Sequence, residues 1–158
     1  MPPDGWYKLY VDASLKTEGC LVGLGAVVRD SQGLFMAGLS QKLVGSVSIE
    51  VAEAAAILNG LHLAIHLRFS RLLVESDALN IVNYINHRDP PLSEVGLIIS
   101  DILSLCSNAF VAFSFVPRCA NFVAHLLVRN SFSGDVVSIW LEDAPPWLDQ
   151  GLLSDIQA

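Results

Sequence analysis

The chain has 158 residues, of which 53% are hydrophobic and 16% charged, and its formal net charge is −7. This length suits one domain with one hydrophobic core, and no apolar run approaches the ~20 residues of a membrane-spanning helix. The negative charge argues against strong non-specific binding to nucleic acid, which depends on Lys and Arg, but weak binding stays compatible with it.

The cysteines and the first residues narrow the class of protein further. The three cysteines lie far apart without a CxxC pattern, so we expect reduced thiols and no structural zinc. The chain begins without the basic and apolar regions of a secretory signal. We therefore expect an intracellular protein of the nucleus or cytoplasm that is not secreted, binds no membrane and is a monomer.

The first forty residues predict three strands. Residues 6–13 are aromatic and β-branched, and apolar runs over 20–29 and 34–40 follow after short polar turns. Short turns between strands predict an antiparallel meander. Gly23 and Gly25 in the second strand indicate the close approach of a neighbouring backbone.

Helices and strands alternate in the rest of the chain. An N-cap at Ser48 opens an Ala-rich helix. The predicted elements are a helix over 48–67, a strand over 71–75, helices over 77–86 and 93–106, a strand over 110–116 and a helix over 120–131. This order predicts an α/β fold with a partly parallel sheet covered on both faces. We expect a single domain over 1–158, with a core over about 6–133 and an irregular acidic tail over about 134–158.

Three acidic residues interrupt segments that otherwise favour burial. Asp12 ends the first strand, Glu53 lies in the first helix, and Asp77 follows the fourth strand. Unpaired buried carboxylates are costly, so a cluster of them needs cations or hydrogen-bond donors. Oxygen ligands without a Cys or close His pair favour Mg²⁺ or Mn²⁺.

Each of these residues also has a purely structural interpretation. Asp12 could form a turn beside Ser14, Glu53 could be a solvated helix residue, and Asp77 could be an N-cap. Their joint occurrence in this order of strands and helices favours the metal site over the three separate roles.

The sequence resembles the type 1 ribonuclease H domains, and among them the plant group related to reverse-transcriptase ribonuclease H segments. The motifs that carry the resemblance are LYVDAS (9–14), GLGAVVRDSQG (23–33), EVAEAAAILNGL (50–61), LLVESDALNIVNYI (72–85), FVPRCANFVAHLL (115–127) and WLEDAPPWL (140–148). The resemblance implies a ribonuclease H-like fold with a five-stranded mixed sheet, three antiparallel strands first, flanked by helices.

The resemblance also implies a two-metal site that uses Mg²⁺ or Mn²⁺. Asp12 would bridge the two ions, and Glu53 and Asp77 would complete the metal ligands. Glu50, one helical turn before Glu53, is a weaker candidate, with a solvated or capping role as the alternative.

The fourth position of the family's catalytic set departs from the common pattern. Many members have an Asp there, after Asn-x-x-Ala, whereas this chain has Asn121 and then His125. Neutral imidazole is a poor Mg²⁺ ligand and a tolerable Mn²⁺ ligand, so we expect a shift toward Mn²⁺. The alternative is that His125 only caps the cluster through a hydrogen bond.

Three further residues are candidates for substrate binding. Ser14 follows the catalytic strand, and Arg118 and Asn121 flank the loop before the last helix. Capping of that helix is an equal alternative for Asn121.

Two functions are compatible with these patterns. The first is a metal-dependent endonuclease that hydrolyses the RNA strand of RNA/DNA hybrids, with activity attenuated by His125. The second is a weak or inactive nucleic-acid-binding or scaffold module derived from a retroelement ribonuclease H domain. The three intact acidic positions favour the enzyme, whereas His125 and the net charge of −7 favour the module.

Overall fold

The fold is seen in a computed structural model that describes residues 2–18 and 20–157, so residues 1, 19 and 158 of the predicted domain lie outside the described residues. Within the described residues, six strands form a sheet of order β5-β4-β1-β2-β3-β6. The strands are β1 (Tyr7–Lys16), β2 (Leu21–Arg29), β3 (Phe35–Val44), β4 (Arg71–Ser76), β5 (Phe110–Phe115) and β6 (Val137–Leu141). The antiparallel meander of β1, β2 and β3 and the parallel pairing of β4 with β1 and β5 confirm the mixed sheet.

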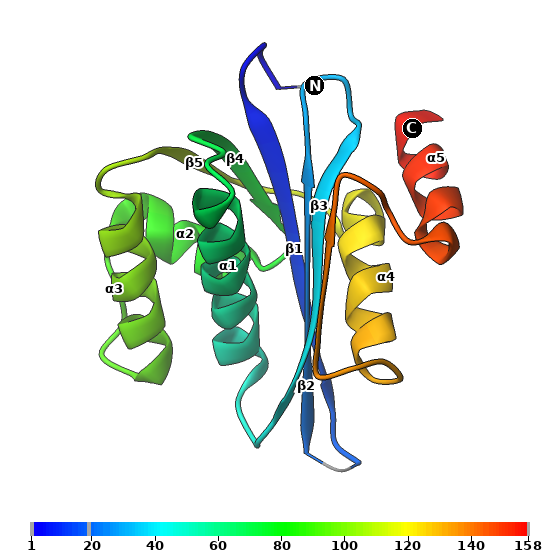
Figure 1. Cartoon of the computed structure of the whole chain (residues 1–158). Helices are drawn as coiled ribbons and strands as arrows, with labels where there is room; N and C mark the ends of the chain where they lie inside the picture. Colours follow the sequence, from blue (N-terminus) through cyan, green and yellow to red (C-terminus); the bar gives the residue numbers. More distant parts are fainter. Residues whose placement is uncertain (1, 19, 158) are drawn as a thin grey trace.

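Helices cover both faces of this sheet (Figure 1). On one face lie α1 (Ile49–His66), α2 (Leu79–His87) and α3 (Glu94–Cys106), and on the other lie α4 (Phe122–Ser131) and α5 (Asp149–Gln157). Short 3-10 turns, η1 (Arg118–Asn121) and η2 (Pro146–Leu148), precede α4 and α5. In the described part of the chain, no helix combines the length and apolarity needed to cross a membrane.

The core has two parts because the sheet is covered on both faces. The larger part joins the sheet to α1, α2 and α3, with Leu9, Ile57 and Ile99 fully buried. The smaller part joins β2 to α4 and the segment after it, through Val27, Leu127 and Leu148 among others. The positions of the side chains at the start of α4 therefore depend on how α4 packs against the sheet.

The C-terminal tail and the number of strands differ from the prediction. The irregular segment expected over 134–158 contains β6, which pairs antiparallel with β3, and α5, so the sheet has six strands instead of five. The pairing supplies hydrogen-bond partners for the backbone groups of β3 that face β6. It joins segments far apart in the chain, and the five-residue sequence of β6 gives no local sign of it. Trp140 of β6 packs edge-on against Trp147, with ring centroids 5.8 Å apart.

Gly25 allows α4 to lie directly on the sheet. A Cβ added to Gly25 would lie 2.5 Å from the carbonyl oxygen of Ala124 and 2.9 Å from the backbone nitrogen of Val128. No side chain fits there, which confirms the predicted close approach of a neighbouring backbone. Since Gly25 pairs with Asp12 in the sheet, α4 meets the sheet directly beside Asp12.

Candidate metal centre

Strand pairing brings two of the predicted acidic residues together. The parallel register of β1 and β4 ends with Val11 opposite Ser76, and Asp12 and Asp77 are the next residues of each chain segment. Asp12 is 4% exposed and lies in an interior strand of the sheet, so its side chain is buried. The turn-forming interpretation of Asp12 is wrong, because β1 continues to Lys16.

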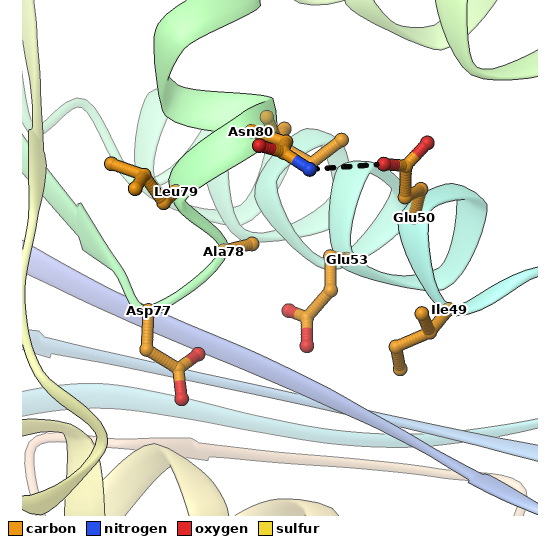
Figure 2. A pocket seen from close by; sticks show the side chains of 8 residues that line it. Ile49, Glu50, Glu53, Asp77, Ala78, Leu79 and Asn80 are labelled. Atoms are coloured by element: carbon orange, nitrogen blue, oxygen red, sulfur yellow. Dashed lines mark hydrogen bonds between the residues drawn. The ribbon is translucent and has the colours of Figure 1, made fainter.

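The helix α1 supplies the third carboxylate. Its N-terminus is fixed by the predicted cap, since the Ser48 hydroxyl accepts a hydrogen bond of 3.2 Å from the Val51 backbone N–H. Glu53 then lies in the second turn and is 8% exposed, which contradicts the solvated alternative. Figure 2 shows the side chains of Glu53 and Asp77 directed into the same space from α1 and from the end of β4.

The three carboxylates form a compact group. One ligand oxygen from each of Asp12, Glu53 and Asp77 lies within 4.8 Å of the other two. Burial, followed by the charges of Asp12 and Asp77, raises the pKa of Glu53 to about 9. Burial and the charge of Asp77 also raise the pKa of Asp12, and the hydrogen bond from His125 opposes this shift.

The residues present fit divalent metal ions. The Oε2 atom of Glu53 is buried and has no hydrogen-bond partner among the described residues. All three side chains offer oxygen ligands, which Mg²⁺ and Mn²⁺ prefer. A cation here would offset the burial and the repulsion that raise the two pKa values, so Asp12, Glu53 and Asp77 are the residues that could hold it.

His125 contacts the carboxylate group through Asp12. It lies in the first turn of α4, and its Nδ1 atom is 3.0 Å from Oδ2 of Asp12. The side chain is half-buried. This contact matches the alternative in which His125 hydrogen-bonds to the cluster.

The structure excludes a capping role for Asp77. The N-cap residue of α2 is Ala78, and no side chain makes a capping hydrogen bond there. The Ala78 backbone N–H instead donates to the hydroxyl of Ser76 at 3.1 Å. The carboxylate of Asp77 is therefore available to the acidic group.

A pocket extends from the acidic group along the N-termini of α1 and α2. Its volume is about 340 Å³, and Glu53 and Asp77 line one part of it. On the far wall, Glu50 accepts a hydrogen bond of 3.4 Å from the side-chain amide of Asn80 (Figure 2). Glu50 thus bonds across the pocket to α2 and is not part of the three-carboxylate group.

The three predicted substrate-binding residues lie in different environments. Ser14 is half-buried two residues after Asp12, so it is on the same side of β1. Arg118 is exposed, and its charge opposes the rise in the pKa of Glu53. Both positions are compatible with contact to a phosphate beside the acidic group.

Asn121 differs from the predictions made for it. It is 1% exposed, and its Nδ2 atom donates a hydrogen bond of 2.6 Å to the carbonyl oxygen of Val11. Its enclosed position argues against the predicted substrate contact. The capping alternative is wrong, because its side chain makes no capping hydrogen bond to α4. Sequence reasoning missed the contact with Val11, since nothing local relates two residues 110 positions apart.

Comparison with known structures defines the fold class. An N-terminal RNase H domain from Mycobacterium tuberculosis is 22% identical, with a TM-score of 0.73, over 81% of this chain and 94% of that chain. RNase H1 from Halobacterium salinarum is 18% identical, with a TM-score of 0.68, over 81% of this chain and 98% of that chain. LC11-RNase H1, solved in complex with an RNA/DNA hybrid, is 19% identical, with a TM-score of 0.72, over 80% of this chain and 96% of that chain. These likenesses establish a ribonuclease H-like fold, as predicted.

The family follows from the sequence match. The reverse transcriptase-like family matches residues 10–131, which include the three carboxylates and His125. The chain therefore belongs to the reverse transcriptase-like family. The match ends before β6 and α5. None of the curated proteins compared with the chain matches it.

The raised pKa of Glu53 predicts how the stability of the metal-free protein depends on pH. Between the ordinary Glu pKa of 4.5 and about 9, the folded state holds a proton that the unfolded state has lost. The free energy of unfolding should therefore fall as pH rises through this window, by up to about 1.4 kcal/mol per pH unit. Glu53→Gln should remove most of this fall, as measured by urea unfolding in EDTA.

Glu94→Gln is the control for this measurement. Glu94 is exposed in the first turn of α3, so its substitution should leave the wild-type dependence on pH. Equal dependence of wild type and Glu53→Gln on pH would contradict a protonated, buried Glu53.

Proposed function

We propose that this protein is a metal-dependent endonuclease that hydrolyses the RNA strand of RNA/DNA hybrids. The observation that carries the proposal is the convergence of Asp12, Glu53 and Asp77 within 4.8 Å on a ribonuclease H-like fold. The membership of the reverse transcriptase-like family supports it. The hybrid bound to LC11-RNase H1 indicates the substrate class that the shared fold accommodates in that protein.

The acidic residues would bind the metal ions and hold them against the substrate. Asp12 would be shared between two ions, with Glu53 and Asp77 as the further ligands. When bound, two divalent ions supply charge that activates water and stabilises the leaving oxygen of a phosphodiester. Asp12 is kept in place by its pairing with Gly25 of β2 and by the ladder to β4 that ends one residue before it, and Glu53 by the capped helix α1. Rigid elements of this kind hold ligands more accurately than loops do.

The surroundings of the carboxylates determine how a substrate would bind. Arg118 is exposed, acts on Glu53 through its charge and would neutralise a phosphate, and Ser14 would donate a hydrogen bond to the nucleic-acid backbone. The pocket bounded by Glu50 and Asn80 leaves room beside the acidic group for the neighbouring nucleotide. With a net charge of −7, binding would depend on these local contacts rather than on general attraction.

A second candidate function is a weak or inactive nucleic-acid-binding module. His125 favours it, because an imidazole bonded to Asp12 stands where many family members have a fourth acidic residue. In this alternative the fold is retained and cleavage is lost. The two functions differ in whether the metal-loaded protein breaks the RNA strand.

Cleavage of a labelled hybrid distinguishes the two functions. The wild-type protein should cut the RNA strand with Mn²⁺ and more slowly with Mg²⁺, because His125 replaces an acidic ligand. Asp12→Asn should lower the rate by at least about 100-fold, the effect of removing one group that stabilises transition-state charge. Asp101→Asn, an exposed change on α3, is the control and should keep the wild-type rate.

A wild-type protein that binds the hybrid but leaves its RNA intact in both metals would overturn the enzymatic proposal. The binding module would then be the function that remains. Cleavage by Asp12→Asn at the wild-type rate would show instead that the activity arises elsewhere.

The His125→Asp variant tests the cause of the metal preference. A fourth carboxylate beside Asp12 should raise cleavage with Mg²⁺ more than cleavage with Mn²⁺, since imidazole is the poorer Mg²⁺ ligand. The ratio of the two rates is the quantity to compare. His62→Asp adds the same charge at an exposed position of α1 and should leave the ratio unchanged. Unchanged or lower Mg²⁺ activity in His125→Asp would show that His125 has a role of its own.

A further inference from the structure

Asn121 connects the start of α4 to the strand that carries Asp12. It is the last residue of η1 and directly precedes α4, and its Nδ2 atom donates to the carbonyl oxygen of Val11 at 2.6 Å. Val11 directly precedes Asp12. The pairing of β1 with β4 ends at Val11, so the amide adds a contact where that ladder stops.

The side-chain oxygen of Asn121 lies in an environment that costs stability. The residue is only 1% exposed, and its buried Oδ1 atom has no hydrogen-bond partner among the described residues. A buried oxygen without a partner is destabilising. Since the side chain does not cap α4 either, the bond to Val11 is the contact that accounts for the residue.

The contact lies next to the bond between Asp12 and His125. Gly25 pairs with Asp12 and lets the backbone of α4 approach at Ala124, the residue before His125. Asn121 holds the same helix one turn earlier, at its start. A hydrogen bond weakens steeply as its geometry departs from the ideal. A small shift of α4 would therefore break the 3.0 Å contact between His125 Nδ1 and Asp12 Oδ2.

We infer that Asn121 is a positioning residue, which holds β1 and the start of α4 together so that His125 meets Asp12 and the carboxylate group keeps its shape. Its effect on metal binding and cleavage rests on the proposed function. Its effect on the contact between His125 and Asp12 does not, and this contact can be measured in the metal-free protein.

Ser40 provides a matched control on the same helix. Ser40 is 1% exposed, and its hydroxyl donates to the carbonyl oxygen of Leu127 at 2.8 Å. This bond also joins α4 to the sheet, but through β3 and farther along the helix. Ser40→Ala thus removes this buried bond, together with the 3.5 Å bond that the hydroxyl accepts from the side-chain amide of Asn130, without touching Val11 or the first turn of α4.

The first experiment compares the side-chain ¹⁵N chemical shifts of His125 in metal-free protein at one fixed pH. Asn121→Ala removes the donor, and Asn121→Asp removes it while keeping the shape of the side chain. Either variant should shift the His125 ring nitrogens away from their wild-type values, whereas Ser40→Ala should not. Asn121→Ala also removes the unpartnered oxygen, which limits its cost in stability and keeps the folded protein accessible to measurement.

The second experiment measures Mn²⁺ affinity by calorimetry. Asn121→Ala should weaken binding by about 10- to 100-fold, as loss of a residue that orients metal ligands does. Ser40→Ala should bind as wild type. Unmoved His125 shifts in the Asn121 variants, or equal movement in Ser40→Ala, would overturn the inference. A wild type that neither binds Mn²⁺ nor cleaves would contradict the proposed function, and the ¹⁵N shifts would still decide the role of Asn121.

Discussion

The mutual repulsion of Asp12, Glu53 and Asp77 is the interaction on which the site depends, because three carboxylates lie within 4.8 Å of one another in a largely buried place. Burial and neighbouring charges raise the pKa of Glu53 to about 9, so the metal-free protein favours a proton on this carboxyl. Holding such a group costs stability, and the proposed metal ions are what would offset that cost.

The fold holds this group by three independent devices. The parallel ladder between β1 and β4 aligns Asp12 with Asp77, and the Ser48 cap sets where α1 begins and hence where Glu53 lies. The third device is the backbone contact of α4 at Gly25, which brings His125 to Asp12. Each device fixes a helix or strand relative to its neighbours, so the proposed metal ligands are already in position in the metal-free protein.

The parts of this arrangement that were predictable from sequence are those with a local signal. The apolar context of Asp12 and Asp77, the cap at Ser48 and the glycine at position 25 each indicate their role within a few residues. The pairing of β6 with β3 and the bond from Asn121 to Val11 depend on contacts between distant segments, which periodicity does not encode. Asp77 shows a different limit of prediction from sequence. Its place before a helix is also typical of an N-cap, and only the structure shows that the N-cap residue is Ala78.

The acidic group supports the proposed endonuclease only if metal ions bind to it. The fold alone is compatible with both the endonuclease and the nucleic-acid-binding module. Anomalous diffraction from crystals grown with Mn²⁺ tests this most directly. We expect anomalous density bonded to carboxylate oxygens of Asp12, Glu53 and Asp77, and its loss in crystals of Asp12→Asn. Crystals that contain Mn²⁺ at other positions, with no density between these three side chains, would contradict a metal site at this acidic group.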